Sequence, residues 1–156
     1  MRVMAFHLAQ VNVARLVAPI DSQQLAGFVA RLDEVNALAE AAPGFVWRLT
    51  DDASNNATSV ALYDDRMIIV NMSVWESIGA LRAFTYSGAH LEVFKQRREW
   101  FAHLEDAATA MWWVPAGHIP TVGEARERLD HLRAHGPTAV AFPFGAPFPP
   151  TRPASA

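Results

Sequence analysis

The 156-residue sequence contains no cysteine. Disulfide bonds, thiolate nucleophiles and cysteine-ligated zinc sites are therefore excluded. Charged residues are sparse at 19%, and the net charge of -3 leaves no basic excess, so no nucleic-acid-binding surface is expected. The 51% of hydrophobic residues is enough for the core of one globular domain.

Long hydrophobic runs are also missing from the sequence. The sequence has no stretch of about 18 apolar residues, the length needed to span a bilayer. The first residues, MRVMAFHLAQVNVARLV, lack the apolar core and the small-residue cleavage site of a secretory signal. We therefore expect a cytoplasmic protein with no membrane partner. A glycine-rich phosphate loop, a G-x-S-x-G elbow and an H-E-x-x-H motif are absent, which disfavours nucleotide-dependent, hydrolytic and zinc-protease chemistry.

The clearest pattern in the sequence is the strict alternation of residues 67–75, MIIVNMSVW. Such alternation is typical of a β-strand whose two faces have different surroundings. One face is purely apolar and suits packing against helices. The other face is mixed, as expected for a cavity or an interface. The apolar face carries Ile68, Val70, Met72 and Val74, and the mixed face carries Met67, Ile69, Asn71, Ser73 and Trp75.

Further strands are expected over residues 3–13, 45–50 and 109–114. A first helix is expected from Asp21 or Ser22 to Pro43, and a second helical region is expected to divide near Gly88 into residues 77–86 and 89–104. The apolar stripe predicted for the first helix consists of Leu25, Phe28, Val29, Leu32, Val35 and Leu38. The order βαββαβ predicts an α+β fold of the ferredoxin-like kind, in which both main helices cover one face of an antiparallel sheet.

An appended third helix is expected to begin at Thr121, with Glu124 completing a capping box, and to end at Gly136. Six of the ten prolines follow it. We therefore predict one ferredoxin-like domain over residues 1–135, including the appended helix, and a proline-rich C-terminal arm over residues 136–156.

The sheet face opposite the two main helices is expected to be bare in a single chain. If that face carries Met67, Ile69 and Trp75, it is too apolar to remain in water. A second copy would cover it, so we expect a two-fold homodimer whose sheets enclose a shared interior.

Several segments of the sequence resemble a bacterial family of unknown function. They are FHLAQVNVAR, GFVWRL, IIVNMSVWESIGALRAF, the H-x6-RREWF run from His90 to Phe101, and WWVPAGHIPTVGEARERLDHLRAHGPT. That family is grouped with the antibiotic-biosynthesis-monooxygenase-like dimeric α+β barrels. The resemblance extends to about Pro150 and implies a homodimer of ferredoxin-like protomers. The wider superfamily includes cofactor-free quinol oxygenases, haem-degrading monooxygenases, other haem enzymes, isomerases and stress proteins. The resemblance thus implies a monooxygenase-like protein that acts on a small hydrophobic or aromatic molecule.

His90 is the candidate ligand for a haem iron, because haem-binding members of the superfamily carry their axial histidine on this helical segment. Phe94, Arg97 and Phe101 follow it at steps of four, three and four, so one helix side would hold all four residues. Arg97 would pair with a haem propionate. The alternative is a half-buried histidine bonded to the backbone, with Arg97 on a solvated basic face.

Asn71 and Trp75 are the candidate catalytic residues of a cavity that needs no cofactor. Asn71, with Ser73, would hydrogen-bond a substrate oxygen, and Trp75 would form a stacking wall. The alternative is that Asn71 bonds across the sheet and Trp75 fills the dimer core. His131 and His135 lie four apart on the third helix but lack a third metal ligand, so an exposed helix end is the better interpretation.

Three hypotheses follow for a mostly apolar cavity between the sheet and the second helix. The first is a haem-linked oxygenase that uses His90. The second is a cofactor-free oxygenase or isomerase that uses Asn71 and Trp75. The third is a non-enzymatic ligand-binding or stress-response dimer whose aromatic residues only form the core.

Overall fold

The computed structural model describes residues 5–50 and 60–150. The polar run DDASNNATS, residues 51–59, predicts a loop and lies outside the described residues. The elements are β1 (Phe6–Leu16), the 3-10 helix η1 (Gln23–Leu25), α1 (Ala26–Ala41), β2 (Phe45–Arg48), β3 (Ile68–Trp75), α2 (Ile78–Thr85), α3 (Gly88–Lys95), α4 (Arg97–Trp100), β4 (Phe101–Ala102), β5 (Thr109–Pro115) and α5 (Val122–His135). None of the described helices is long and apolar enough to cross a membrane.

The strands form one antiparallel sheet in the order β5-β1-β3-β2, and the two-residue β4 pairs with the C-terminal end of β1. The long β1 and β3 strands make the centre. Their register places Gln10 opposite Ser73 and Asn12 opposite Asn71. This strand order, with helices between β1 and β2 and between β3 and β5, confirms the predicted ferredoxin-like α+β fold.

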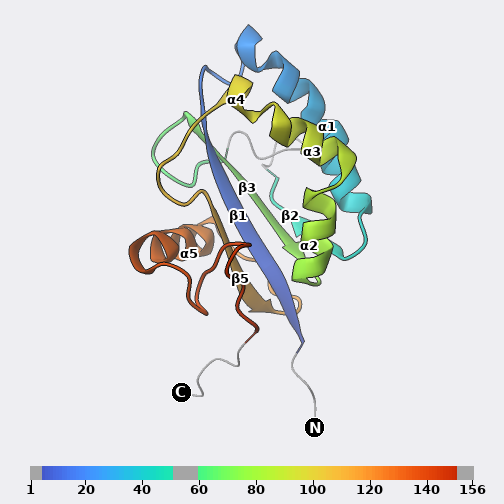
Figure 1. Ribbon diagram of the computed structural model, residues 1–156, viewed down its shortest axis with the longest axis vertical. Coiled ribbons are helices and arrows are strands. Elements are labelled where there is room, and N and C mark those ends of the chain that lie inside the picture. Colours follow the sequence, from blue (N-terminus) through green and yellow to red (C-terminus); the bar gives the residue numbers. More distant parts are fainter. Residues whose placement is uncertain (1–4, 51–59, 151–156) are drawn as a thin grey trace.

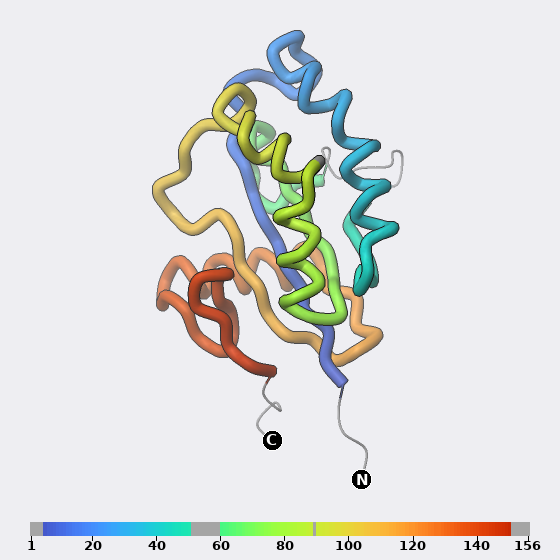
Figure 2. The backbone as a smooth tube through the Cα atoms, turned by 45° about the vertical axis from the view of Figure 1, so that its right-hand side comes forward, coloured from blue at the N-terminus to red at the C-terminus, as the bar shows by residue number. Residues whose placement is uncertain are grey.

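The helices form two layers on opposite faces of the sheet. Helices α1 to α4 lie together on one side of β1 and β3, and α5 lies on the other side, against β5 and β1 (Figure 1). In Figure 2 the α1 helix runs beside the α2–α3 segment, in agreement with the contacts between α1 and α3. The core on the α5 side is built from alternate apolar residues of β1, β3 and β5, such as Val11, Met72 and Trp112, with Leu129 of α5.

The mixed face of β3 lines a cavity and its aliphatic face packs against a helix, as expected, but the expectation of a bare sheet face carrying Trp75 was wrong. The mixed face, with Trp75, looks toward α1, α2 and α3, whereas the aliphatic face, with Met72 and Val74, packs on the α5 side. Trp75 is only 1% exposed in the single chain. The argument that a bare face carrying Trp75 requires a second copy therefore does not hold, because the chain's own helices cover that face.

The predicted helix over residues 89–104 was also wrong in its second half. Helix α3 ends at Lys95, a single turn follows as α4, and Phe101 lies in β4 with extended backbone. The interruption falls at Gln96, whose φ of -90° and ψ of 4° leave the helical region. His90 and Phe101 therefore do not share one helix side.

Helix α1 buries less of its predicted stripe than the sequence pattern indicates. Phe28 is 8% exposed, but Val29 and Leu38 are 42% and 44% exposed. Leu32 and Val35 line a cavity, and Leu32 is only partly buried against the core cluster around Phe28. The helix thus stands over an open space, so its contact stripe is narrower than that of a helix packed directly on a sheet.

The C-terminal arm packs onto the sheet over its first part. Phe142 is fully buried and forms backbone hydrogen bonds with Met111 of β5 in both directions. The indole Nε1 of Trp113 donates to the carbonyl oxygen of Phe148 at 2.7 Å. These contacts place the arm beside α2, where Phe144 reaches the cavity. The division into a domain over residues 1–135 and an arm over 136–156 stays a prediction.

Candidate functional site in the cavity between the sheet and the helices

A cavity of about 480 Å³ lies between the mixed face of the sheet and helices α1, α2 and α3. The sheet supplies a polar strip, and the helices supply mostly apolar side chains. Pockets for small molecules usually have this size and this make-up. The lining residues used below are Gln10, Asn71, Ser73 and Trp75 from the sheet, and Phe28, Arg31, Phe84, His90 and Phe94 from the helices.

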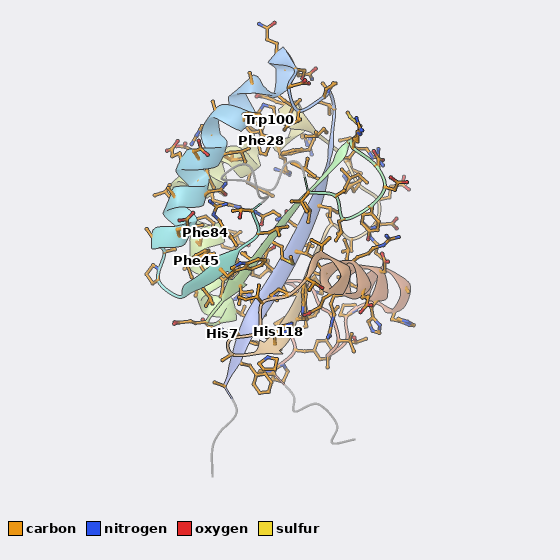
Figure 3. The ribbon with its side chains drawn as sticks, turned by 180° about the vertical axis from the view of Figure 1, so that it is seen from behind. His7, Phe28, Phe45, Phe84, Trp100 and His118 are labelled. Atoms are coloured by element: carbon orange, nitrogen blue, oxygen red, sulfur yellow. The ribbon has the colours of Figure 1, made fainter. Side chains whose placement is uncertain are left out.

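Aromatic side chains mark two ends of this cavity. At one end Phe28 packs against Trp100 and Phe101, with ring centroids 5.5 and 5.0 Å away. Toward the other end Trp75 stacks on Phe84 at 5.4 Å and meets Phe45 edge-on at 5.5 Å. Figure 3 shows Phe28 with Trp100 near the top of the helical layer, and Phe45 with Phe84 lower down. A flat, apolar ligand between these ends would contact ring faces and edges.

The polar strip on the sheet is a connected hydrogen-bond network. The side-chain amide of Gln10 donates from Nε2 to Ser73 Oγ at 2.7 Å and to Asn71 Oδ1 at 2.8 Å. The indole Nε1 of Trp75 donates to the same Ser73 Oγ at 2.8 Å. Gln10 and Ser73 are buried, with 4% and 7% exposure, whereas Asn71 is open to the cavity. The network therefore fixes the side chains of Gln10 and Ser73 in the sheet wall of the cavity and leaves the side-chain amide of Asn71 open to the cavity.

His90 stands on the helical wall of the cavity, at the start of α3. Its Nδ1 lies 3.0 Å from the carbonyl oxygen of Thr85, and its ring meets Phe84 edge-on at 5.3 Å. Because a carbonyl can only accept, Nδ1 carries the proton, and Nε2 keeps its lone pair in the neutral ring. Burial lowers the pKa of His90 below the ordinary 6.5, and the opposing effect of the bond to Thr85 is smaller. The imidazole is therefore neutral at pH 7 and is a proton acceptor at Nε2.

The predicted site residues are brought together with one exception. Asn71, Trp75, His90, Phe94 and Phe101 all line the cavity, although they come from three different elements, β3, α3 and β4. Their catalytic and binding roles stay predictions.

Arg97 is not among the lining residues. Its guanidinium donates to the carbonyl oxygen of Phe94 at 3.0 Å and covers the Phe94 ring at 4.1 Å. This exposed position follows from the end of α3 at Lys95, which turns Arg97 away from the line through His90 and Phe94.

Two residues of the site, Gln10 and Phe84, were missed by the sequence reasoning. Gln10 follows the same signal as Asn71, because it is a polar residue between the apolar Ala9 and Val11 of an alternating strand. The cross-strand register that joins Gln10 to Ser73 depends on long-range pairing. Phe84 has the same apolar spacing as core residues, so its role as the ring between Trp75 and His90 had no sequence signal of its own.

Two arginines line the cavity, Arg31 of α1 and Arg48 of β2. Arg31 of α1 is bound to Glu92 of α3 at 3.0 Å and to Glu34 at 3.2 Å, and Arg48 is bound to Glu40 at 2.7 Å. These cations are therefore already paired with carboxylates of the same chain.

Within residues 5–50 and 60–150, no group of three or more histidine, cysteine, aspartate or glutamate side chains could hold a metal ion. His131 and His135 lie with ring centroids 4.4 Å apart, and His131 Nε2 lies 3.1 Å from the hydroxyl of Thr138.

The fold and the site define a ferredoxin-like α+β protein with a small-molecule cavity between its sheet and its helices. This is the fold expected for a protomer of the monooxygenase-like superfamily named above. The chain belongs to the family described as domain of unknown function (DUF3291), whose model matches residues 7–156. The predicted membership of a family of unknown function is thereby confirmed. A comparison with curated proteins gives no match.

Several solved structures are similar to this chain. A conserved protein from Methanosarcina mazei Go1 has 12% identity and a TM-score of 0.50, over 70% of this chain and 92% of its own. Rv0793 from Mycobacterium tuberculosis has 15% identity and a TM-score of 0.49, over 74% and 99%. SnoaB, a cofactor-independent oxygenase from Streptomyces nogalater, has 19% identity and a TM-score of 0.43, over 74% and 97%. The likeness to the Methanosarcina protein shows a shared fold, and the other two carry no further argument.

Proposed function

We propose that this protein is an oxygenase-like enzyme that binds a small aromatic molecule in the cavity and uses His90 as its base. The observation that carries the proposal is the bond from His90 Nδ1 to the carbonyl oxygen of Thr85. It leaves the unprotonated Nε2 of a neutral imidazole in a mostly apolar cavity. A base with this environment is ready to take a proton from a weakly acidic ligand at neutral pH.

The chemistry that fits the site begins with proton transfer. An aromatic compound with an acidic ring CH₂ group, or its phenol tautomer, gives its proton to His90 Nε2, and Asn71 hydrogen-bonds the oxygen on which negative charge develops. The electron-rich anion then reacts with O₂. One oxygen atom replaces two hydrogens on a ring CH₂ carbon to form a carbonyl, and the other oxygen atom leaves with those hydrogens as water. Trp75 and Phe84 form the wall on which the aromatic ring stacks.

Oxygen uptake tests this proposal. We expect purified protein with anthrone-type aromatics, which carry a ring CH₂ group, to consume O₂ and to form the carbonyl product. In efficient enzymes a general base contributes about a hundredfold or more to the rate. The His90→Gln variant should therefore lose at least about tenfold in rate. His103→Gln is the matched control, because His103 is exposed and lies outside the cavity. Equal rates for the wild type and His90→Gln would contradict the assignment.

Saturable binding of such aromatics without O₂ uptake would instead support the non-enzymatic hypothesis. In that case the cavity is a ligand site, and Trp75 fluorescence would report its occupancy, because the Trp75 ring lines the cavity.

Haem is the second candidate, since an imidazole with Nδ1 bonded to a carbonyl and Nε2 unprotonated is also suited to ligate iron. The fit is incomplete. Arg97, expected to bind a propionate, lies on the surface against Phe94. Arg31 is already paired with Glu92. The described residues therefore fit the iron but not the propionates, and no reaction step is assigned to haem. A hemin titration decides the matter: a Soret band that saturates at one haem per chain and shifts in His90→Ala would restore the haem hypothesis.

We also propose that the protein is a homodimer. The surface of the helical layer exposes Tyr86 and Phe94 at 65% and 48%, an apolar area that a second copy would cover. Light scattering at micromolar concentration should give twice the 17.2 kDa of one chain. A mass of one chain would contradict the dimer.

A further inference from the structure

We infer that Gln10 is a positioning residue that turns the sheet wall of the cavity into a hydrogen-bond donor, so that the site selects ligands with a phenolate or carbonyl oxygen. This inference rests on the proposed function, because it names the ligand class of the same cavity. Gln10 lies at the centre of β1, between Leu8 and Asn12 on the face that looks toward the helices. Its side chain is 4% exposed and bonds two residues of the neighbouring strand.

The polarity of the network begins at Trp75. An indole N–H can only donate, so Ser73 Oγ accepts from Trp75 at 2.8 Å. Ser73 Oγ also accepts from Gln10 Nε2 at 2.7 Å. A hydroxyl oxygen has two lone pairs, and these two donors occupy both of them. The remaining hydrogen-bonding capacity of Ser73 is its own O–H, for which the described residues offer no acceptor.

The same amide group sets the direction of Asn71. Gln10 Nε2 donates to Asn71 Oδ1 at 2.8 Å, so the carbonyl end of Asn71 is occupied. The NH₂ end of Asn71 has no acceptor in the part of the chain that the structure describes, and the residue is open to the cavity. Asn71 therefore presents a donor to a ligand. With Gln10 in the opposite orientation, Asn71 would donate to Gln10 and present its carbonyl oxygen instead.

Two neutral donors on one wall complement the base on the other wall. His90 accepts a proton at Nε2, and the resulting ligand oxygen is stabilised by the Asn71 amide and the Ser73 hydroxyl. No carboxylate lines the cavity among the described residues, so the anion meets no like charge there. The two lining cations, Arg31 and Arg48, are paired with Glu92 and Glu40 and are present in every variant tested below. The chemical class is thus an aromatic compound with a phenolic or carbonyl oxygen beside its acidic hydrogen.

The test uses 4-nitrophenol, whose absorption differs between the phenol and the phenolate. When 4-nitrophenol binds to the wild-type protein, the pKa of its hydroxyl should fall below the value in water, because the donors of Asn71 and Ser73 favour the phenolate. Gln10→Met keeps the side-chain length but removes both bonds. It should weaken phenolate binding about tenfold, the value of one hydrogen bond to a charged group. Gln24→Met, on an exposed residue of η1, is the matched control and should bind as the wild type. Unchanged binding in Gln10→Met would overturn the role of Gln10 while leaving the proposed function intact.

A second variant tests the polarity without a ligand. Asn71→Asp retains an oxygen that can accept from Gln10 Nε2, and the exposed position leaves the new charge in water. We expect its urea midpoint and the Trp75 indole N–H resonance to match the wild type. A lowered midpoint with a shifted indole resonance would show that Asn71 donates to Gln10, which overturns the inference. If the wild type does not bind 4-nitrophenol or any other phenol, the proposed function fails, and this measurement still decides the polarity.

Discussion

The Nδ1 atom of His90 donates to the carbonyl oxygen of Thr85 across the break between α2 and α3. Thr85 is the last residue of α2, so this bond satisfies one of the carbonyl groups that a helix end leaves open. His90 thus links α3 to the end of α2 by a hydrogen bond, and its Nε2 remains unprotonated. The alternative expected for His90 was a half-buried histidine bonded to the backbone, and the bond to Thr85 has this geometry. The same bond leaves Nε2 unprotonated, so a structural role and a role as a base are compatible.

The His90 contact predicts how stability depends on pH. Because its pKa is lowered below 6.5 in the folded state, unfolded His90 binds protons that folded His90 does not, and stability falls as the pH drops below 6.5. Urea unfolding at pH 7.5 and pH 5.5 should show a smaller loss for His90→Gln than for the wild type. The control His103→Gln should behave as the wild type. An identical loss in all three proteins would contradict the lowered pKa.

Gly44 is predicted to resist substitution. Its φ is +83°, and a Cβ at this position would lie 2.5 Å from the Cβ of Ala80 in α2. Gly44→Ala should therefore cost about 1–3 kcal/mol of unfolding free energy, from backbone strain and displacement of α2. Gly88→Ala is the matched control, since nothing lies within 4 Å of the added carbon, and it should be neutral or stabilise by up to about 1 kcal/mol. Equal midpoints for the two variants would contradict this account.

Glu124 is predicted to be the main polar anchor of α5. Its carboxylate accepts from the indole Nε1 of the fully buried Trp112 at 2.8 Å and contacts His118 Nε2 at 2.7 Å. Glu124→Ala should cost about 1–3 kcal/mol, because it leaves the indole N–H of Trp112 without its partner. Glu127→Ala, on the exposed side of the same helix, should change stability by no more than about 0.5 kcal/mol. The comparison is made by urea unfolding, and similar losses would count against the anchor.

Tyr63 is predicted to ionise late in an alkaline titration. Burial and the hydrogen bond from its hydroxyl to Asp130, at 2.6 Å, raise its pKa from 10.0 to about 12. Because the folded state then holds a proton that the unfolded state loses, this contribution to stability is complete below pH 10 and is lost as the pH rises toward 12. The ultraviolet absorbance of tyrosinate should show a component near pH 12 that Tyr63→Phe removes and Tyr86→Phe keeps. Loss of this component in Tyr86→Phe instead would reverse the assignment.

The cap of α5 shows where sequence reasoning succeeds. Thr121 accepts from the backbone N–H of Glu124 at 3.0 Å, and Gly136 ends the helix with a φ of +75°, both as the residue types predict. The second half of the expected capping box was wrong, because the Glu124 carboxylate bonds Trp112 and His118 instead of the Thr121 backbone. The Thr121 cap and the Gly136 end depend on neighbours within a few residues, so the local sequence contains the whole of their cause. The alternation of β3 is of the same kind.

The surroundings of each sheet face were beyond the reach of that reasoning. Alternation separates Asn71 and Trp75 from Met72 and Val74, but both faces of the sheet meet helices, and only the packing of α5 decides which helix covers which face. The end of α3 at Lys95, which leaves Arg97 outside the cavity, likewise depends on the pairing of Phe101 with Leu16 of β1. Long-range contacts of this type compete with local helix preference and can override it.

The sequence by itself determined the order of the main strands and helices, the ferredoxin-like class, the caps of α5 and five of the residues that line the cavity. These follow from periodicity and from short-range hydrogen bonding, which act within a segment. The tertiary structure alone decided the partner of each polar group: Gln10 with Ser73 and Asn71, and His90 with Thr85. A hydrogen bond between distant strands requires the fold to fix both groups within about 3 Å, and no local pattern specifies that distance.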